Sequence, residues 1–243
     1  MTDQPLVERL RALSHARLRL GRAGSSLPTR AQLAFELDHA RARDAVVSPF
    51  EPVGLADALG REVIEIASRA ADRTEYLRRP DLGRRLDDAS AARLTRGDYD
   101  LAIVIADGLS PAAVHAHAAS VALALFERLA DWAIAPVTVA RLGRVALGDE
   151  VGEALGAKLV CVLIGERPGL TAPDSLGAYL TWNPAPGRQD SERNCISNIR
   201  PPRGLSYDKA ADTIARLLTA ARRSGATGIG LKDGPAALPR AEG

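Results

Sequence analysis

From residue 98 onward, two hydrophobic patterns alternate along the chain. Short runs of consecutive apolar residues, typical of buried strands, alternate with longer segments whose apolar residues recur every three or four positions, as in helices. The runs predict strands within 98–108 and at 137–140, 158–164, 178–182 and 228–231. The periodic segments predict helices at 111–131, 148–155 and 207–223. This alternation favours an α/β fold, a mostly parallel sheet with helices on both faces.

The first part of the chain predicts helices and loops instead. An arginine-rich segment at 5–20 has leucines at helical spacing and predicts an amphipathic helix. After a turn-rich connector, Thr29 is a candidate N-cap for a second helix that continues to Val46. Helical periodicity resumes over 55–69. We therefore expect three parts, a helical N-terminal region at 1–96, an α/β domain at 97–233 and a flexible tail at 234–243.

Two polar segments in the α/β part are candidate ligand loops. The loop after strand 158–164 contains Glu166 and Arg167 among glycines and prolines, and no turn type requires those two charged residues. The polar run 193–202 contains Cys195. Ligands of open α/β sheets bind at loops beyond the carboxyl ends of strands, so both segments are expected at such an edge.

The turn after the first strand of this domain has two open interpretations. Asp107 and Gly108 form an ordinary turn dipeptide, but the same aspartate also stands at the ligand-binding edge of the sheet. Ser110 is the expected N-cap of the next helix, with Pro111 at its first position.

Motifs of several enzyme classes are absent from the sequence. The turn ADGLSPAAV lacks the G-x-G-x-x-G fingerprint of dinucleotide sites, and there is no P-loop and no G-x-S-x-G nucleophile elbow. His115 and His117 are two positions apart, so a helix places them on different faces and not around one metal ion. No catalytic residue and no metal ligand set is predicted. The chain therefore has the features of a protein that contributes part of an active site and is not a complete enzyme by itself.

Composition excludes other classes of function. The net charge is +2 and the arginines are interleaved with acidic residues, which does not favour a nucleic-acid-binding face. No apolar run is long enough to span a bilayer, and the first residues lack the apolar core of a signal peptide. Cys161 lies in an apolar run and is expected to be buried, whereas Cys195 lies in a polar segment, so no disulfide is expected. We expect a cytoplasmic protein that binds neither nucleic acid nor membrane.

A series of segments gives the chain a family resemblance. In order, they are LGRAGSSLPT, LDHARARDAV, DRTEYLRRPDLGRRL, VIADGLS, RVALGDEVGE, LIGERPGL, PDSLGAYLTW, RNCISNIRP and GIGLKD. Taken together, these segments are specific. From about Leu10 to Asp233 the chain resembles the small, or light, subunit of ethanolamine ammonia-lyase.

The resemblance implies a function that the residues alone do not predict. Members of this family act with a TIM-barrel large subunit that carries the substrate and the radical chemistry, by which ethanolamine gives acetaldehyde and ammonia. Adenosylcobalamin, a cobalt cofactor, lies between the two chains. The resemblance thus implies a Rossmann-like cobalamin-binding domain in a lyase of ethanolamine catabolism, inactive without its partner and associated in some bacteria with a microcompartment.

The resemblance also implies which residues hold the cofactor. The family's cobalamin contacts match Val145, Glu166 and Cys195 of this sequence. A carboxylate suits the amide groups on the rim of a corrin ring, and valine suits its methyl groups. As hypotheses, Arg144, Arg167 and Arg193 are partners for the phosphate of the nucleotide tail, and the N-terminal region docks on the large subunit. The alternatives are a stand-alone α/β enzyme and a non-catalytic scaffold protein of ethanolamine metabolism.

Overall fold

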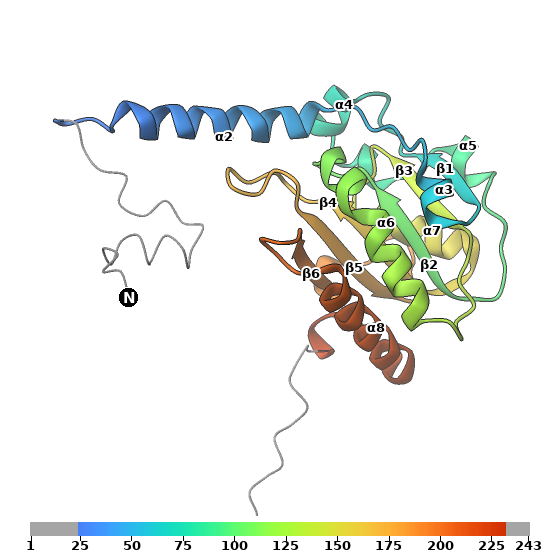
Figure 1. Cartoon of the computed structure of the whole chain (residues 1–243). Coiled ribbons are helices and arrows are strands. Elements are labelled where there is room, and N and C mark those ends of the chain that lie inside the picture. Colours follow the sequence, from blue (N-terminus) through green and yellow to red (C-terminus); the bar gives the residue numbers. More distant parts are fainter. Residues whose placement is uncertain (1–23, 232–243) are drawn as a thin grey trace, which may run out of the picture.

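The computed structural model describes residues 24–231, so the predicted helix at 5–20 and the predicted tail at 234–243 lie outside the described residues. Within this range, helices cover both faces of a six-stranded sheet, which confirms the predicted α/β class (Figure 1).

The sheet is mostly parallel, as predicted. Its spatial order is β1-β3-β2-β4-β5-β6. The first four strands in that order are parallel, whereas β5 runs antiparallel to both β4 and β6. Because β6 therefore runs in the direction of β4, the carboxyl ends of every strand but β5 lie at one edge. The strand bounds are β1 (Val63–Ala67), β2 (Tyr99–Ala106), β3 (Val137–Arg141), β4 (Ala157–Gly165), β5 (Leu176–Trp182) and β6 (Arg193–Ile199).

The helices have different relations to this sheet. α6 and α8 pack on one face and α7 on the other, while α2 extends away from the sheet (Figure 1). Ala45 is the one buried residue of α2. The bounds are α2 (Thr29–Val47), α3 (Leu55–Leu59), α4 (Arg73–Arg78), α5 (Asp88–Ala91), α6 (Pro111–Arg128), α7 (Leu147–Leu155) and α8 (Tyr207–Ser224), with short 3₁₀ turns η1 (Leu82–Arg84), η2 (Asp190–Glu192) and η3 (Gly228–Gly230).

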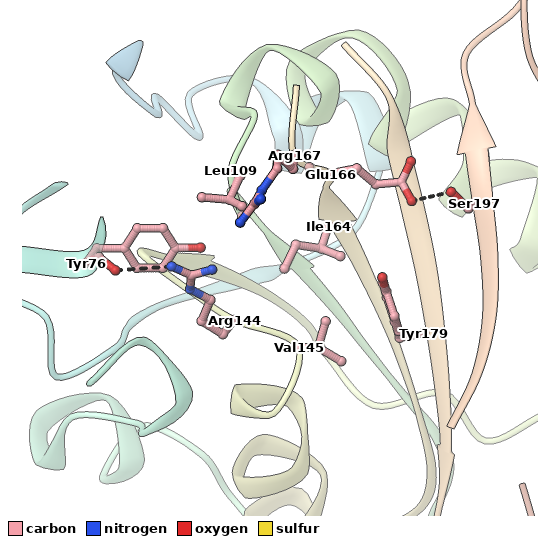
Figure 2. Close-up of a pocket in the computed structure, with 11 residues that line it drawn as sticks. Tyr76, Leu109, Arg144, Val145, Ile164, Glu166, Arg167, Tyr179 and Ser197 are labelled. Atoms are coloured by element: carbon pink, nitrogen blue, oxygen red, sulfur yellow. Dashed lines mark hydrogen bonds between the residues drawn. The ribbon is translucent and has the colours of Figure 1, made fainter. Parts of the chain in front are cut away.

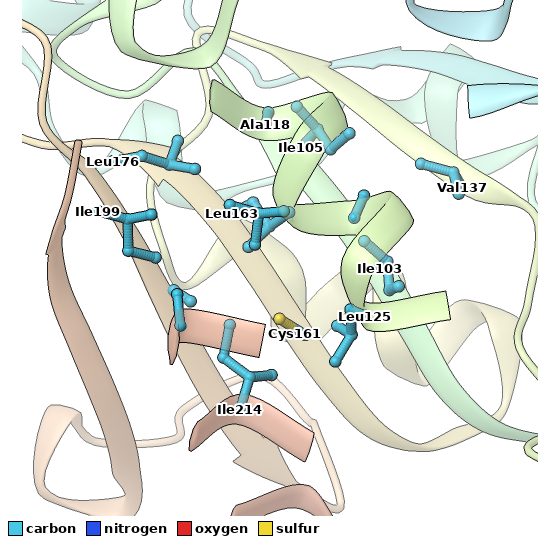
Figure 3. Packing of buried hydrophobic residues seen from close by; sticks show 14 of the residues in the cluster. Ile103, Ile105, Ala118, Leu125, Val137, Cys161, Leu163, Leu176, Ile199 and Ile214 are labelled. Carbon is cyan, nitrogen blue, oxygen red and sulfur yellow. The ribbon is translucent and has the colours of Figure 1, made fainter. Parts of the chain in front are cut away.

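The two faces of the central strand β2 carry apolar side chains of different size. On β2, Ile103 and Ile105 face α6 and α8, whereas Ala102 and Val104 face α7. Figure 3 shows the first of these clusters, in which Cys161 is fully buried, as its apolar setting predicted. The smaller side chains on the second face let α7 lie close to the sheet.

The predicted helix caps have different outcomes. The hydroxyl of Ser110 accepts a hydrogen bond from the backbone N–H of Ala113 at 3.2 Å, and Pro111 is the first residue of α6, as predicted. Thr29 is wrong as an N-cap, because it is the first residue of α2 itself and Pro28 precedes the helix without a side-chain cap.

The predicted helix at 55–69 is also wrong. Gly60 adopts a left-handed conformation with φ 59° and ends α3. The next apolar residues, from Val63 to Ala67, form β1, which pairs in parallel with β3. The N-terminal part of the chain therefore contributes an edge strand to the sheet.

Two further segments differ from the sequence prediction. Residues 193–199, predicted as a polar loop, form strand β6, and residues 228–231, predicted as a strand, begin with the 3₁₀ turn η3. β6 was missed because only Ile196 and Ile199 of this strand are buried apolar residues. An edge strand with one polar face does not show a continuous apolar run.

Gly148 tests the close contact between α7 and the sheet. A Cβ atom on Gly148 would lie 2.3 Å from Cγ2 of Val162, whereas one on Gly169 would meet nothing nearer than 3.9 Å. We expect Gly148→Ala to lower the free energy of unfolding by about 1–3 kcal/mol through overpacking, although alanine favours helices over glycine by about 1 kcal/mol. Urea denaturation of the full chain measures this change, with Gly169→Ala as the control. An unchanged midpoint for Gly148→Ala would contradict the packing described.

Candidate functional site

A cavity of about 470 Å³ lies at the carboxyl-end edge of the sheet, on the α7 face (Figure 2). The β2–α6 turn, the β3–α7 turn, the end of β4 and helix α4 form its walls, together with residues of β5 and β6. The lining residues are Tyr76, Gly108, Leu109, Arg144, Val145, Ile164, Gly165, Glu166, Arg167, Tyr179 and Ser197. Val145 and Glu166, singled out by the sequence, thus lie in the walls of one cavity.

The cavity depends on close backbone contact between the β2–α6 turn and the end of β4. The backbone N–H of Leu109 donates to the carbonyl oxygen of Gly165 at 2.9 Å. A Cβ atom on Gly165 would lie 2.1 Å from the carbonyl oxygen of Ser110, and Gly108 has a left-handed φ of 57°. Any larger residue at position 165 would separate the β2–α6 turn from β4.

Glu166 joins the end of β4 to β6. Its carboxylate accepts hydrogen bonds from the hydroxyls of Ser175 and Ser197, each at 2.5 Å, and from the backbone N–H of Asn198 at 3.2 Å. Gly177 on β5 makes room for this side chain, because a Cβ atom there would lie 3.0 Å from Oε1. A carboxylate has about four acceptor positions, so Glu166 retains capacity for one further donor.

Arg144 presents a guanidinium group that its surroundings satisfy only in part. The group lies 4.3 Å above the ring of Tyr76 and donates to the backbone carbonyl of Tyr76 at 3.2 Å. Its Nε atom is buried and has no hydrogen-bond partner. Arg167 also lines the cavity and is exposed, and Figure 2 shows its guanidinium group beside Leu109, on the side of Arg144. Both arginines have the charge needed to bind an anionic group.

Cys195 lies beside the cavity and not in its lining. It is an exposed residue of β6, not of a loop as predicted, and it pairs with Tyr179 of β5. Desolvation raises the pKa of its thiol above the ordinary value, and desolvation also raises the pKa of Tyr179. A thiol with a raised pKa is a poor nucleophile, so Cys195 is suited to contact a ligand and not to attack one.

Arg193 is not available to a ligand. Its guanidinium group makes a two-pronged ion pair with Asp149 of α7, at 2.6 Å for each bond, and also donates to the hydroxyl of Thr181 at 2.8 Å. The side chains of Arg193 and Asp149 are both 2% exposed. The hypothesis that Arg193 binds phosphate is therefore wrong, because a buried carboxylate occupies its donors.

The histidines of α6 lie on different faces of the helix, as predicted. His115 is exposed and accepts a hydrogen bond from the backbone N–H of Glu51, whereas His117 is buried and contacts the hydroxyl of Tyr207 at 3.0 Å. In residues 24–231, no group of three or more His, Cys, Asp or Glu side chains is arranged to hold a metal ion. No helix in that range is both long and apolar enough to cross a membrane.

Several residues of the cavity lining, Tyr76, Tyr179 and Ser197 among them, were not singled out from the sequence. Tyr76 is the one aromatic residue in a basic segment, and its complete burial distinguishes it from its neighbours. Tyr179 and Ser197 belong to β5 and β6, and they reach the cavity because both point to the α7 face of the sheet. Alternation along β5 indicates which residues share a face, but only the fold shows which face holds the cavity.

Comparison with known proteins gives a consistent set of matches. The family profile described as "Ethanolamine ammonia-lyase light chain" matches residues 4–232 of this chain. The ethanolamine ammonia-lyase small subunit of Bradyrhizobium diazoefficiens is 58% identical, over 92% of this chain and 89% of the relative. Small subunits of the same name are 54% identical in Rhodopseudomonas palustris (92% and 88% covered) and 51% identical in Azotobacter vinelandii (96% and 89% covered). The similarity therefore spans both the N-terminal region and the sheet.

The two aspartates beside Arg193 provide a matched test of its buried ion pair. Asp149 is 2% exposed, whereas Asp190 lies 3.6 Å from Nε of Arg193 and is 93% exposed. We expect Asp149→Asn to lower the free energy of unfolding by about 3–5 kcal/mol, because it leaves a buried guanidinium group without its counter-charge. Asp190→Asn should change it by less than about 1 kcal/mol. Urea denaturation monitored by circular dichroism measures both, and equal effects would contradict the assignment of Asp149 as the partner.

Proposed function

The chain belongs to the ethanolamine ammonia-lyase light-chain family, and from this premise we propose that it holds adenosylcobalamin against a catalytic large subunit. The proposed product of the two-chain enzyme is acetaldehyde with ammonia, formed from ethanolamine. The large subunit carries the substrate in this proposal, and the chain described here has no activity alone.

The composition of the cavity wall is the observation that carries this proposal. Val145, Ile164 and Leu109 supply apolar surface, while Glu166 supplies an acceptor held in place by hydrogen bonds from its own chain. Arg144 supplies a guanidinium group whose hydrogen-bonding capacity is only partly used. Apolar surface, an acceptor for amide groups and a cation for phosphate match the methyl groups, amides and nucleotide tail of cobalamin. This set of residues suits binding and contains no activated nucleophile.

Each wall residue has its own task in this proposal. Glu166 accepts an N–H from a peripheral amide of the corrin, and Val145 packs against the ring's apolar edge. Cys195 contacts the cofactor from β6, beside Tyr179. Arg144 and Arg167 bind the phosphate of the nucleotide tail. When bound, the cofactor supplies the radical chemistry, and this chain supplies orientation and exclusion of water.

Helix α2 is the proposed docking element for the large subunit. It extends from the sheet (Figure 1) and exposes large apolar side chains, with Leu33 58% and Leu37 51% exposed. Exposed apolar surface of this kind marks sites of protein association. We propose a hetero-oligomer of both chains in the cytoplasm, within a microcompartment where the host forms one.

Omission of each chain in turn tests the function. The full chain is co-expressed with its large subunit, adenosylcobalamin is added, and ammonia release that depends on ethanolamine is measured. We expect activity only when both chains and the cofactor are present. Activity of the chain alone would indicate a stand-alone α/β enzyme. Full activity of the large subunit alone would indicate a scaffold role.

The two cavity arginines provide a sharper test of cofactor orientation. We expect Arg144→Ala and Arg167→Ala each to weaken binding of cyanocobalamin to the two-chain complex by about tenfold, equal to about 1.4 kcal/mol, through loss of a charged contact. Binding of cobinamide, which lacks the nucleotide tail, should stay unchanged. Absorbance titration measures both ligands, with the exposed Arg223 on α8 as the control in Arg223→Ala. Equal weakening for both ligands would exclude phosphate as the group recognised.

A further inference from the structure

An ion pair between Arg73 and Asp107 lies outside the cavity lining but contacts the lining residue Gly108. Nη1 of Arg73, the first residue of α4, lies 3.2 Å from Oδ2 of Asp107 and donates to the carbonyl oxygen of Gly108 at 2.8 Å. The same arginine donates from Nε to the carbonyl oxygen of Val46 at 2.7 Å. The other oxygen of Asp107 accepts the backbone N–H of Gly143 at 3.0 Å. One pair of side chains thus joins four segments of the chain.

These four segments include the end of α2 and the wall of the cavity. Val46 belongs to the last turn of α2, and Gly143 precedes Arg144 and Val145 in the β3–α7 turn. The hydroxyl of Tyr76, also on α4, donates to the carbonyl oxygen of Gly143 at 3.1 Å. Both polar groups of the Gly143 backbone are therefore held by these side chains.

The backbone of the β3–α7 turn needs such support. Leu142 has a positive φ of 55°, a conformation that is strained for a leucine. Strained backbone persists where its surroundings fix it on several sides. The contacts from Asp107 and Tyr76 to Gly143 supply that restraint directly beside Arg144.

Stability alone does not explain this pair. Asp107 is 2% exposed and Arg73 18% exposed, and Nη2 of Arg73 is buried without a hydrogen-bond partner. Burial raises the pKa of Asp107 to about 6 against the opposing effect of Arg73. A buried ion pair of this kind is often no more stable than an apolar replacement, so its value lies in the specific geometry that it imposes.

We propose that Arg73 and Asp107 are positioning residues that tie the root of helix α2 to the cavity wall at Arg144 and Val145. The ligand and the docking partner in this inference rest on the function proposed above. A partner that binds α2 would shift Val46, which accepts a hydrogen bond from Arg73, and Arg73 is paired with Asp107 at the cavity wall. Binding of a ligand in the cavity and binding of a partner at α2 are therefore coupled, and each affects the affinity of the other.

Hydrogen–deuterium exchange of the full chain tests the tie without any cofactor. Asp107→Asn keeps the size of the side chain but removes its charge, and we expect exchange to accelerate by about tenfold in both 44–50 and 142–147. Arg73→Lys keeps a charge that faces Asp107 but cannot also reach Val46. It should accelerate exchange in 44–50 and leave 142–147 close to the wild type. The control Asp212→Asn removes an ion pair with Arg128 between α6 and α8, and it should alter neither segment.

The exchange pattern distinguishes positioning from a general loss of stability. Acceleration across the whole sheet in Asp107→Asn would overturn the proposal, as would acceleration in only one of the two segments. Thermal denaturation of each variant accompanies the exchange measurement. We expect Asp107→Asn to lower the melting temperature less than Asp149→Asn does, because Arg73 is 18% exposed and also donates to the carbonyl oxygen of Val46, whereas Arg193 is 2% exposed.

Cobalamin affinity and its pH dependence extend the test to the two-chain complex. The charged or titratable groups facing Asp107 are Arg73 and Tyr76 of α4, and Arg144 lies beyond that tyrosine. Arginine and tyrosine side chains do not titrate near pH 6, so loss of the ion pair below about pH 6 would reflect protonation of the Asp107 carboxylate. We expect cyanocobalamin affinity of the wild type to fall as the pH drops through about 6, and Asp107→Asn to bind about tenfold more weakly without that dependence.

The two proposals fail in different ways. A wild-type complex that does not bind cobalamin would refute the proposed function. The exchange pattern would still show whether Arg73 and Asp107 link helix α2 to the cavity wall. Equal cobalamin affinities and equal pH profiles of the wild type and Asp107→Asn would refute the positioning role and leave the proposed function standing.

Discussion

The contact between the β2–α6 turn and the end of β4 is the constraint on which the cavity depends. Leu109 donates to Gly165 across this contact, and a side chain on Gly165 would collide with the backbone of Ser110. Because the two strands are parallel neighbours, their ends emerge together. On one side of this contact, Glu166 follows β4 and accepts a hydrogen bond from Ser197 of β6. On the other side, Asp107 accepts the backbone N–H of Gly143 in the β3–α7 turn. The close contact between the backbones of Leu109 and Gly165 therefore fixes the positions of both the β4–β6 wall and the β3–α7 wall of the cavity.

Much of the sheet could be predicted from the sequence because its central strands are buried on both faces. β2 and β4 show continuous apolar runs, which indicate strands without any knowledge of their neighbours. The two edge strands, β1 and β6, have exposed polar residues and were predicted as helix and loop. What defines them is pairing with β3 and β5, and such pairing is a property of the fold and not of the local pattern.

The same distinction applies to the site. The rule that ligands bind beyond the carboxyl ends of strands predicted a ligand loop at Glu166, whereas Val145 was named by the family resemblance alone. The rule does not identify Tyr76 or Tyr179, since their approach to the cavity depends on how α4 and β5 pack. Nor does it separate Arg193 from the other arginines, because its partner Asp149 is 44 positions away in the sequence.

The carboxylates nearest to each arginine decide which positive charges remain for a ligand. Arg193 is neutralised by Asp149 in a buried two-pronged pair. Arg73 and Arg144 both lie against the ring of Tyr76, at 4.8 and 4.3 Å, and Asp107 faces only the first of them. The wall around this tyrosine therefore has an excess of positive charge inside partly buried surroundings, where an unmatched charge is unfavourable. A bound anion at Arg144 would balance that charge, which supports phosphate as the group that this side of the cavity recognises.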